Sequence, residues 1–322
     1  MKRCVCVMLT AALLLSGTAA FAQAASDFSV ELTDDGEGVR IKEYTGQAAR
    51  VTVPATIEGF PVKVIGEGAF SNNERLTAVT LSAGLTTIED YAFHNSRLTT
   101  VTLPAGLTTI GDRAFRLCNS LTGIVIPDSV IEIGESAFSG CTALQSVTLP
   151  KSVTKMGEYI FSGCYALKTV TIPEGASAIG ASMFEECSAL TTLTIPNSVI
   201  SIGKSAFEKS GLTRVTLGTG ITVIPSRAFY GCTKLTALVI PEGVTKIESV
   251  AFSSCSGLAS VTFPSTIEAI DGAFSDCTAL TTVTIPDSVE TISFSDNAFR
   301  GCSKMNLTSQ AALKKRGYTG GF

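Results

Sequence analysis

A phenylalanine that returns every 22 to 25 residues constrains the fold of this chain more than any other feature. The units around it share the pattern L-x-x-V-x-[IL]-P-x-x-[VIL]-x-x-I-G-x-x-A-F-x-x-C. Its eleven occurrences are Phe70, Phe93, Phe115, Phe138, Phe161, Phe184, Phe207, Phe229, Phe252, Phe274 and Phe299. A steady period of this length is typical of a solenoid, in which each unit packs only on its neighbours. The 322 residues therefore need not divide into several globular domains.

The spacing within one unit predicts a short strand followed by a turn. In the unit that ends at Phe161, the apolar residues Val147 and Leu149 flank a polar residue, which is the period-2 pattern of a strand. Pro150 ends this strand because proline has no N–H to donate, and nine of the eleven units carry proline there. Gly157 provides the backbone freedom for a corner. One unit leaves its apolar residues exposed, whereas stacked units bury them.

The repeats, residues 51–307, are therefore predicted to form an α/β-type solenoid of eleven units of about 23 residues. Parallel strands such as Val79–Leu81 would build a concave sheet, and irregular or short helical segments would form the convex side. Neighbouring strands lie about 4.8 Å apart, so ten steps give a sheet roughly 50 Å long. A strand on one side and a bulkier segment on the other predict the arc of leucine-rich repeats.

The two ends of the chain depart from the repeat. Residues 1–22 have the pattern of a signal peptide: Lys2 and Arg3 precede a short apolar run, which small residues follow. We therefore expect an exported protein, secreted, periplasmic or at the cell surface, without a membrane-spanning segment. Residues 26–50 are predicted to form an N-terminal capping hairpin around the turn pair Asp35-Gly36. Residues 308–322 are predicted to form a C-terminal cap.

The repeated motifs L-x-x-[VL]-x-[IL]-P and I-G-x-x-A-F-x-x-C resemble the BspA-like class of leucine-rich repeats over about residues 26–307. This resemblance implies a leucine-rich-repeat fold and a secreted or surface protein. The family includes bacterial adhesins that bind host extracellular-matrix and plasma proteins, fibronectin and fibrinogen among them. The resemblance therefore also implies a protein partner.

The cysteines follow the repeat and do not form a catalytic or metal-binding pattern. Eight of them lie three residues after a repeat phenylalanine: Cys118, Cys141, Cys164, Cys187, Cys232, Cys255, Cys277 and Cys302. Identical positions on adjacent coils point the same way, whereas a disulfide needs converging Cβ atoms, so buried free thiols are predicted. No C-x-x-C pair occurs, and His94 is the single histidine. We therefore expect no metal site, cofactor or enzyme activity.

The predicted concave face is rich in threonine and poor in charge. From Leu76 to Leu280, the three outward positions of ten strands make 30 sites, which hold 19 threonines and two charges, Lys168 and Arg214. Threonine favours strands because it is β-branched, so the fold alone could explain this composition. Alternatively, the surface serves to contact a large partner, as extended solenoid faces do. A net charge of −4 without basic clusters argues against nucleic acid.

We therefore predict a monomeric protein-binding module. Since binding hot spots lie near the centre of an interface, the predicted contact residues belong to the central strands: Thr148, Lys168, Thr171, Thr194, Arg214 and Thr216. Two alternatives remain open. The solenoid could be a structural, self-associating scaffold of a cell envelope without a specific ligand. Its Thr-x-Thr pairs could also match an ice lattice, although four residues interrupt that array: Ala78, Gly123, Arg214 and Ala237.

Overall fold

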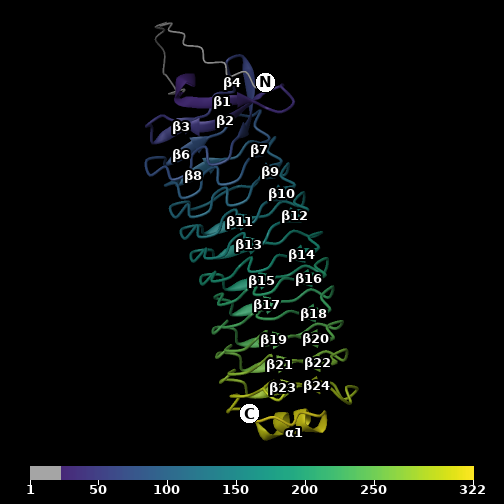
Figure 1. Cartoon of the computed structure of the whole chain (residues 1–322). Coiled ribbons are helices and arrows are strands. Elements are labelled where there is room, and N and C mark those ends of the chain that lie inside the picture. The colour runs from purple at the N-terminus through teal and green to yellow at the C-terminus, as the bar shows by residue number, and fades with distance from the viewer. Residues whose placement is uncertain (1–22) are drawn as a thin grey trace.

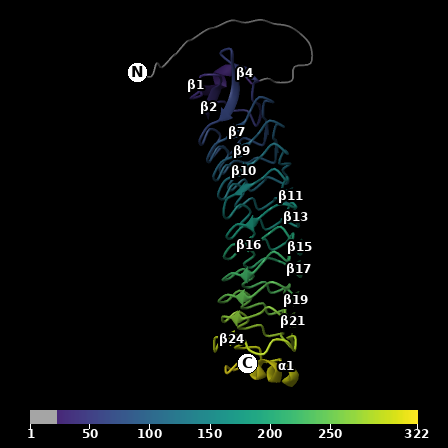
Figure 2. The ribbon, with the colours of Figure 1, turned by 90° about the vertical axis from the view of Figure 1, so that its right-hand side faces the viewer.

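The computed structural model describes residues 23–322, so the predicted signal peptide lies outside the described residues. These residues form an elongated column of stacked coils, with the N-terminal strands at one end and a helix at the other (Figure 1). The column bends only gently in this view and in the view turned by 90° (Figure 2). A weak bend is expected because, within residues 23–322, no helical layer thickens one side of the repeats.

One side of the column carries strands of three residues each, which we call the front sheet. They are β3 (Arg50–Thr52), β6 (Ala78–Thr80), β8 (Thr100–Thr102), β11 (Ser146–Thr148), β13 (Thr169–Thr171), β15 (Thr192–Thr194), β17 (Arg214–Thr216), β19 (Ala237–Val239), β21 (Ser260–Thr262) and β23 (Thr282–Thr284). The paired strands are parallel and in register, so equivalent residues of neighbouring coils lie side by side. The predicted parallel strand solenoid is confirmed.

The predicted strand bounds need two corrections. The second front strand is Ala78–Thr80, one residue earlier than the predicted Val79–Leu81. One predicted strand is missing, because residues 121–126 have no strand assignment. Gly123 lies in this segment and has open space around it, and a glycine weakens a strand since it has no side chain to pack.

A second column of strands, which we call the side sheet, was not predicted. Its strands have two residues each, and the second one is apolar. They are β7 (Thr87–Ile88), β9 (Thr109–Ile110), β10 (Glu132–Ile133), β12 (Lys155–Met156), β14 (Ala178–Ile179), β16 (Ser201–Ile202), β18 (Val223–Ile224), β20 (Lys246–Ile247), β22 (Ala269–Ile270) and β24 (Ser293–Phe294). Two residues are too few to show the alternation from which a strand is predicted.

The expected short helical segments on the convex side are wrong. Each coil instead turns around its phenylalanine through residues in the left-handed region. Around Phe161, for example, φ is +58° at Tyr159 and +72° at Gly163. A right-handed helix needs negative φ at every residue, so these turns cannot become helical. Within residues 23–322, the helices are a 3-10 turn at Ala25–Asp27 and α1 (Leu307–Lys315) near the C-terminus.

The core is built from ladders of identical side chains. The repeat phenylalanines are buried, and each ring stacks on the next with centroids 5.0–5.7 Å apart. The prediction that stacking of the units buries their apolar residues is confirmed. The eight repeat cysteines are buried beside them. Each thiol donates a hydrogen bond of 3.1–3.2 Å to the phenylalanine carbonyl of the preceding coil.

Both ends of the core are covered. At the N-terminus, β1 (Phe28–Leu32) and β2 (Val39–Tyr44) form an antiparallel hairpin. The ring of Tyr44 stacks on Phe70 at 5.2 Å. The hairpin continues into the side sheet through β5 (Phe60–Ile65), which also pairs with β4 (Thr56–Ile57). At the other end, Ser309 in α1 accepts a hydrogen bond from the backbone N–H of Val283 in β23, and Tyr318 packs edge-on against Phe299.

Candidate functional site

The six predicted contact residues lie on the front sheet of neighbouring coils, and all six side chains are exposed. The strand register places Thr148 beside Thr171 and Thr194 beside Thr216. Arg214 lies beside Thr192 at the start of the same pair of strands. Lys168 immediately precedes β13. Each threonine at the last strand position faces solvent because the residue before it points into the core.

Part of this surface is hollowed. A depression of about 370 Å³ extends across β13, β15 and β17. Four of the six predicted residues line it: Thr171, Thr194, Arg214 and Thr216. Thr148 and Lys168 do not line the depression. The structure therefore brings four predicted residues to one concavity and leaves two beside it.

The depression lies at a break in the front sheet. Strand β11 pairs with β13, and β15 pairs with β17, but no ladder joins β13 to β15. The middle residue of β13, Val170, is only half-buried, whereas the middle residues of the other front strands are buried. A ladder is missing between β17 and β19 as well, so the half-buried Val170 is what distinguishes the coil at this depression.

Sequence analysis did not predict this break, but one residue of the same coil gives a signal. Ala176 occupies a core column that holds a leucine, valine or isoleucine in neighbouring units, such as Val153 and Val199. The smaller side chain fills less of the core, so the coil of β13 has fewer contacts that fix it against its neighbour. Ala176 is therefore the sequence signal that the packing of this coil differs from that of its neighbours.

The two cations among the predicted contact residues are available for binding. None of the ion pairs within residues 23–322 involves Arg214 or Lys168. The guanidinium of Arg214 carries five N–H donors in a planar fork, and the threonine hydroxyls beside it both donate and accept. One carboxylate, that of Glu174, lines the same depression. This set of groups is suited to hydrogen bonding with a polar partner surface.

Within residues 23–322, few other side chains near this face could take part in metal binding or catalysis. Residues 23–322 contain no group of three or more His, Cys, Asp and Glu side chains that could hold a metal ion. His94 lies beside the ring of Tyr91 at the turns around the phenylalanines, away from the front strands. Burial lowers the pKa of His94, and the nearby guanidinium of Arg116 lowers it further.

Comparison with known proteins assigns the repeats. A family described as the BspA type leucine rich repeat region matches residues 50–127, 108–236 and 222–314. The chain belongs to the BspA-type leucine-rich-repeat family. The resemblance found in the repeat motifs is thereby confirmed. A search of curated proteins finds no significant match. No helix in residues 23–322 is long and apolar enough to cross a membrane.

Several solved structures are similar to the BspA-type chain. A leucine-rich repeat protein from Eubacterium ventriosum is 24% identical with a TM-score of 0.50, and the match covers 86% of this chain and 93% of that one. A leucine rich cell surface protein from Faecalibacterium prausnitzii is 28% identical with a TM-score of 0.40, covering 84% and 96%. A leucine-rich repeat protein from Bacteroides ovatus is 24% identical with a TM-score of 0.47, covering 94% and 99%. The first of these likenesses supports the leucine-rich-repeat fold.

Proposed function

We propose that this BspA-type protein is an exported, adhesin-like binding module whose front sheet contacts a protein partner. Membership of the family suggests a role in protein interaction or at a surface. The observation that carries the proposal is the depression at β13, β15 and β17, which is lined by Arg214, a residue without an ion-pair partner among residues 23–322. A host matrix or plasma protein such as fibronectin or fibrinogen is the proposed partner, and the module acts as a monomer.

The depression supplies what a binding centre requires. Hot spots lie where water is best excluded, and arginine is a favoured anchor because its fork makes several hydrogen bonds at once. The surrounding threonines are short and uncharged, so a partner can approach the backbone closely. Since the face carries so little charge, the affinity should depend only modestly on salt.

The capped ends of the column weigh against the alternative of a self-associating scaffold. End-to-end stacking would need exposed strands or an open core at both ends. The hairpin covers Phe70 at one end, and Tyr318 covers Phe299 at the other.

The proposal is tested with immobilised fibronectin and fibrinogen and with folded variants of the chain. Arg214→Ala should weaken binding by about tenfold or more, because truncating an anchor typically costs more than 1 kcal/mol. Thr171→Arg should block binding, since a long charged side chain would fill the depression. The matched control is Thr80→Arg, which makes the same change at the equivalent position of β6, outside the depression.

Binding should be measured at low and at high salt, with circular dichroism to verify folding. If Arg214→Ala and Thr171→Arg both bind like the parent, the front sheet is only a scaffold. If Thr80→Arg weakens binding as much as Thr171→Arg, the depression is not the centre of the contact.

A further inference from the structure

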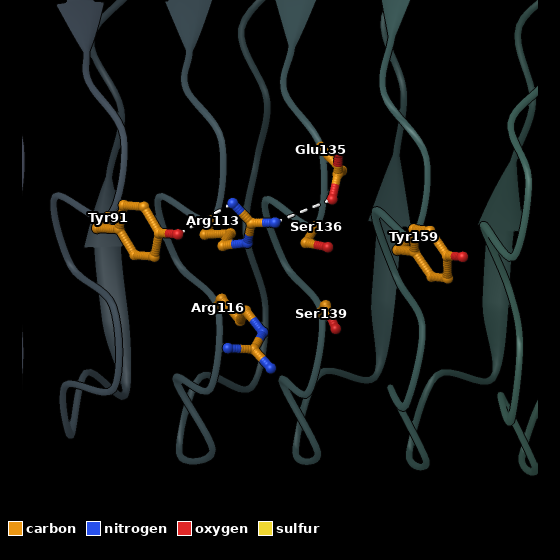
Figure 3. Close-up of a pocket in the computed structure, with 7 residues that line it drawn as sticks. All are labelled: Tyr91, Arg113, Arg116, Glu135, Ser136, Ser139 and Tyr159. Atoms are coloured by element: carbon orange, nitrogen blue, oxygen red, sulfur yellow. Dashed lines mark hydrogen bonds and ion pairs between the residues drawn. The ribbon is translucent and has the colours of Figure 1, made fainter.

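A second and larger hollow lies at the turns around the repeat phenylalanines, away from the front sheet. Its volume is about 530 Å³, and two arginines, a glutamate, two serines and two tyrosines line it (Figure 3). These side chains come from successive coils and lie along a row of equivalent turns. None of them belongs to the front sheet, so this hollow is independent of the proposed protein-binding function.

The hollow results from a difference in side-chain size between neighbouring coils. Two columns of residues line the turns here, one two positions before the repeat phenylalanine and one directly after it; Ser136 in the first column is buried, whereas Tyr159 in the same column is exposed. In the coil of Phe138 both positions hold serine, Ser136 and Ser139. The preceding coil holds two arginines at these positions, and the following coil holds Tyr159 and Ser162. The serines next to Arg113, Arg116 and Tyr159 leave a trough that is open to solvent.

The trough has the width of about two coil spacings. Each spacing is 5.3–5.7 Å, measured between the ring centroids of the stacked phenylalanines below. Two such spacings leave room for one six-membered sugar ring between the arginine wall and Tyr159. The side chain of Tyr159 stands at the far wall in Figure 3, and it is 39% exposed, so part of its ring is open to a ligand.

The two arginines of the other wall differ in their surroundings. The guanidinium of Arg113 is fixed, because it donates to the hydroxyl of Tyr91 at 2.9 Å and to the carboxylate of Glu135 at 3.0 Å. Arg116 takes part in no ion pair within residues 23–322. Arg116 therefore offers a free cationic fork, which suits the planar geometry of a carboxylate.

We propose that this trough binds one acidic sugar unit of a glycan, a pyranose that carries a carboxylate. The carboxylate pairs with Arg116, and the ring packs on Tyr159, whose side chain has an apolar body and a polar tip. The sugar hydroxyls donate to the carboxylate of Glu135 and exchange hydrogen bonds with Ser136 and Ser139. A neutral sugar would leave the guanidinium of Arg116 without a carboxylate partner. A simple carboxylate would neither pack on Tyr159 nor donate a hydrogen bond to Glu135.

The repeat itself supplies conservative variants for the test. In the coil of Phe138, serine occupies both equivalent positions: Ser139 corresponds to Arg116, and Ser136 corresponds to Tyr159. The backbone accepts serine at the second position, because φ is +56° at Ser136 and +58° at Tyr159. Arg116→Ser and Tyr159→Ser should therefore fold like the parent. Arg300 directly follows Phe299, as Arg116 follows Phe115, and it is exposed. Arg300→Ser is thus the matched control, since it removes the same charge from the same column.

The probes are trigalacturonate, its fully methyl-esterified neutral form, and glutarate, which has carboxylates but no sugar ring. Ligand-detected saturation-transfer NMR on the full chain gives the affinity of each. Trigalacturonate should bind, and its affinity should fall about tenfold in Arg116→Ser and in Tyr159→Ser, since a charge-assisted hydrogen bond or a stacked ring is lost. Arg300→Ser should leave the affinity unchanged, and the neutral form should bind about tenfold more weakly to the parent than the acid does.

Three results would overturn the proposal. The first is the absence of any trigalacturonate signal with the parent. The second is glutarate binding as well as trigalacturonate, which would mean that the trough holds a carboxylate rather than a sugar. The third is an equal loss of affinity in Arg300→Ser, which would mean a general effect of charge. None of these results bears on fibronectin or fibrinogen binding at the front sheet, so the two proposals fail separately.

Discussion

Replacing Phe184 with alanine should destabilise the solenoid more than any substitution on its surface. The ring of Phe184 is fully buried and lies between two others, with centroids 5.7 Å from Phe161 and 5.6 Å from Phe207. The planes of the three rings are nearly parallel, at 10° and 8°. Truncation therefore removes one large buried side chain and two stacked contacts at once.

The magnitude follows from how little the site can collapse. Replacing a buried phenylalanine with alanine typically costs about 3–5 kcal/mol, and the cost is larger where the cavity stays open. One strand ladder joins this coil to each neighbour, β11 to β13 on one side and β14 to β16 on the other. The turns are also joined, because Phe161 N–H donates to the carbonyl of Met183 and Phe184 N–H to that of Ala206. Phe161 and Phe207 therefore cannot easily move together to fill the gap. We therefore expect a loss of about 4 kcal/mol or more, concentrated at the interfaces of this coil with its two neighbours.

Urea unfolding followed by circular dichroism measures the loss, and amide hydrogen exchange shows where it falls. The control is Thr194→Ala in β15, where the side chain is exposed and the change should stay within about 0.5 kcal/mol. Equal losses for the two variants would contradict the assignment of inward and outward residues. A loss below about 1 kcal/mol for Phe184→Ala would contradict the stacked-ring argument itself.

Two further predictions concern buried polar groups. Burial raises the pKa of Cys118 to about 11 and that of Cys164 to about 12, so the repeat thiols should resist iodoacetamide at pH 8 until the chain unfolds. Thiols of the unfolded chain ionise near pH ~8.5, whereas the buried thiols stay protonated. Above that pH the free energy of unfolding should therefore fall by about 1.4 kcal/mol per thiol and pH unit. A free energy of unfolding that stays constant between pH 8 and 10 would refute this. Arg227→Ser should cost about 2 kcal/mol at pH 7, because it leaves the buried carboxylate of Glu208 without the guanidinium that donates to it at 2.6 and 2.9 Å. Hydrogen bonding to Arg227 lowers the pKa of Glu208 in the folded chain. The stability that the pair contributes is therefore fully present above the pKa of unfolded Glu208 and is lost as pH falls through the pKa of folded Glu208. If parent and variant still differed as much in their free energy of unfolding at pH 3 as at pH 7, this assignment would be contradicted.

Much of the candidate site could be predicted from sequence because the repeat fixes the direction of every side chain. Once the strand of one coil is known, Thr171, Thr194 and Thr216 must lie on the same face, since they occupy the same position of successive units. The depression that unites them with Arg214 could not be predicted. It depends on whether neighbouring strands are joined by a ladder, and β13 is joined to β11 but not to β15. The sequence does not show this, because the Thr-Val-Thr of β13 occurs in β8 and β23 as well.

The conformation of the turns could not be predicted either. The repeat requires the chain to return on itself every 22 to 25 residues, but that length is compatible with a short helix or with a series of turns. The left-handed conformations of Tyr159, Ser136 and Arg113 exclude the helix. The sequence does not indicate these conformations, because none of the three residues is a glycine. Their φ values are set by the carbonyl groups of the next coil, to which the turn N–H groups donate.

The repeat period alone is sufficient to predict the solenoid, the core ladders and the threonine-rich face. A period of identical apolar positions allows burial only by stacking, so the outcome is largely independent of the residues between them. The positions of the hollows, in contrast, depend on how the coils pack. The hollows lie where coils about 22 residues apart differ, beside the half-buried Val170 in one case and at serines next to arginines and a tyrosine in the other. Such differences become cavities only when stacking brings the coils within about 5 Å of each other.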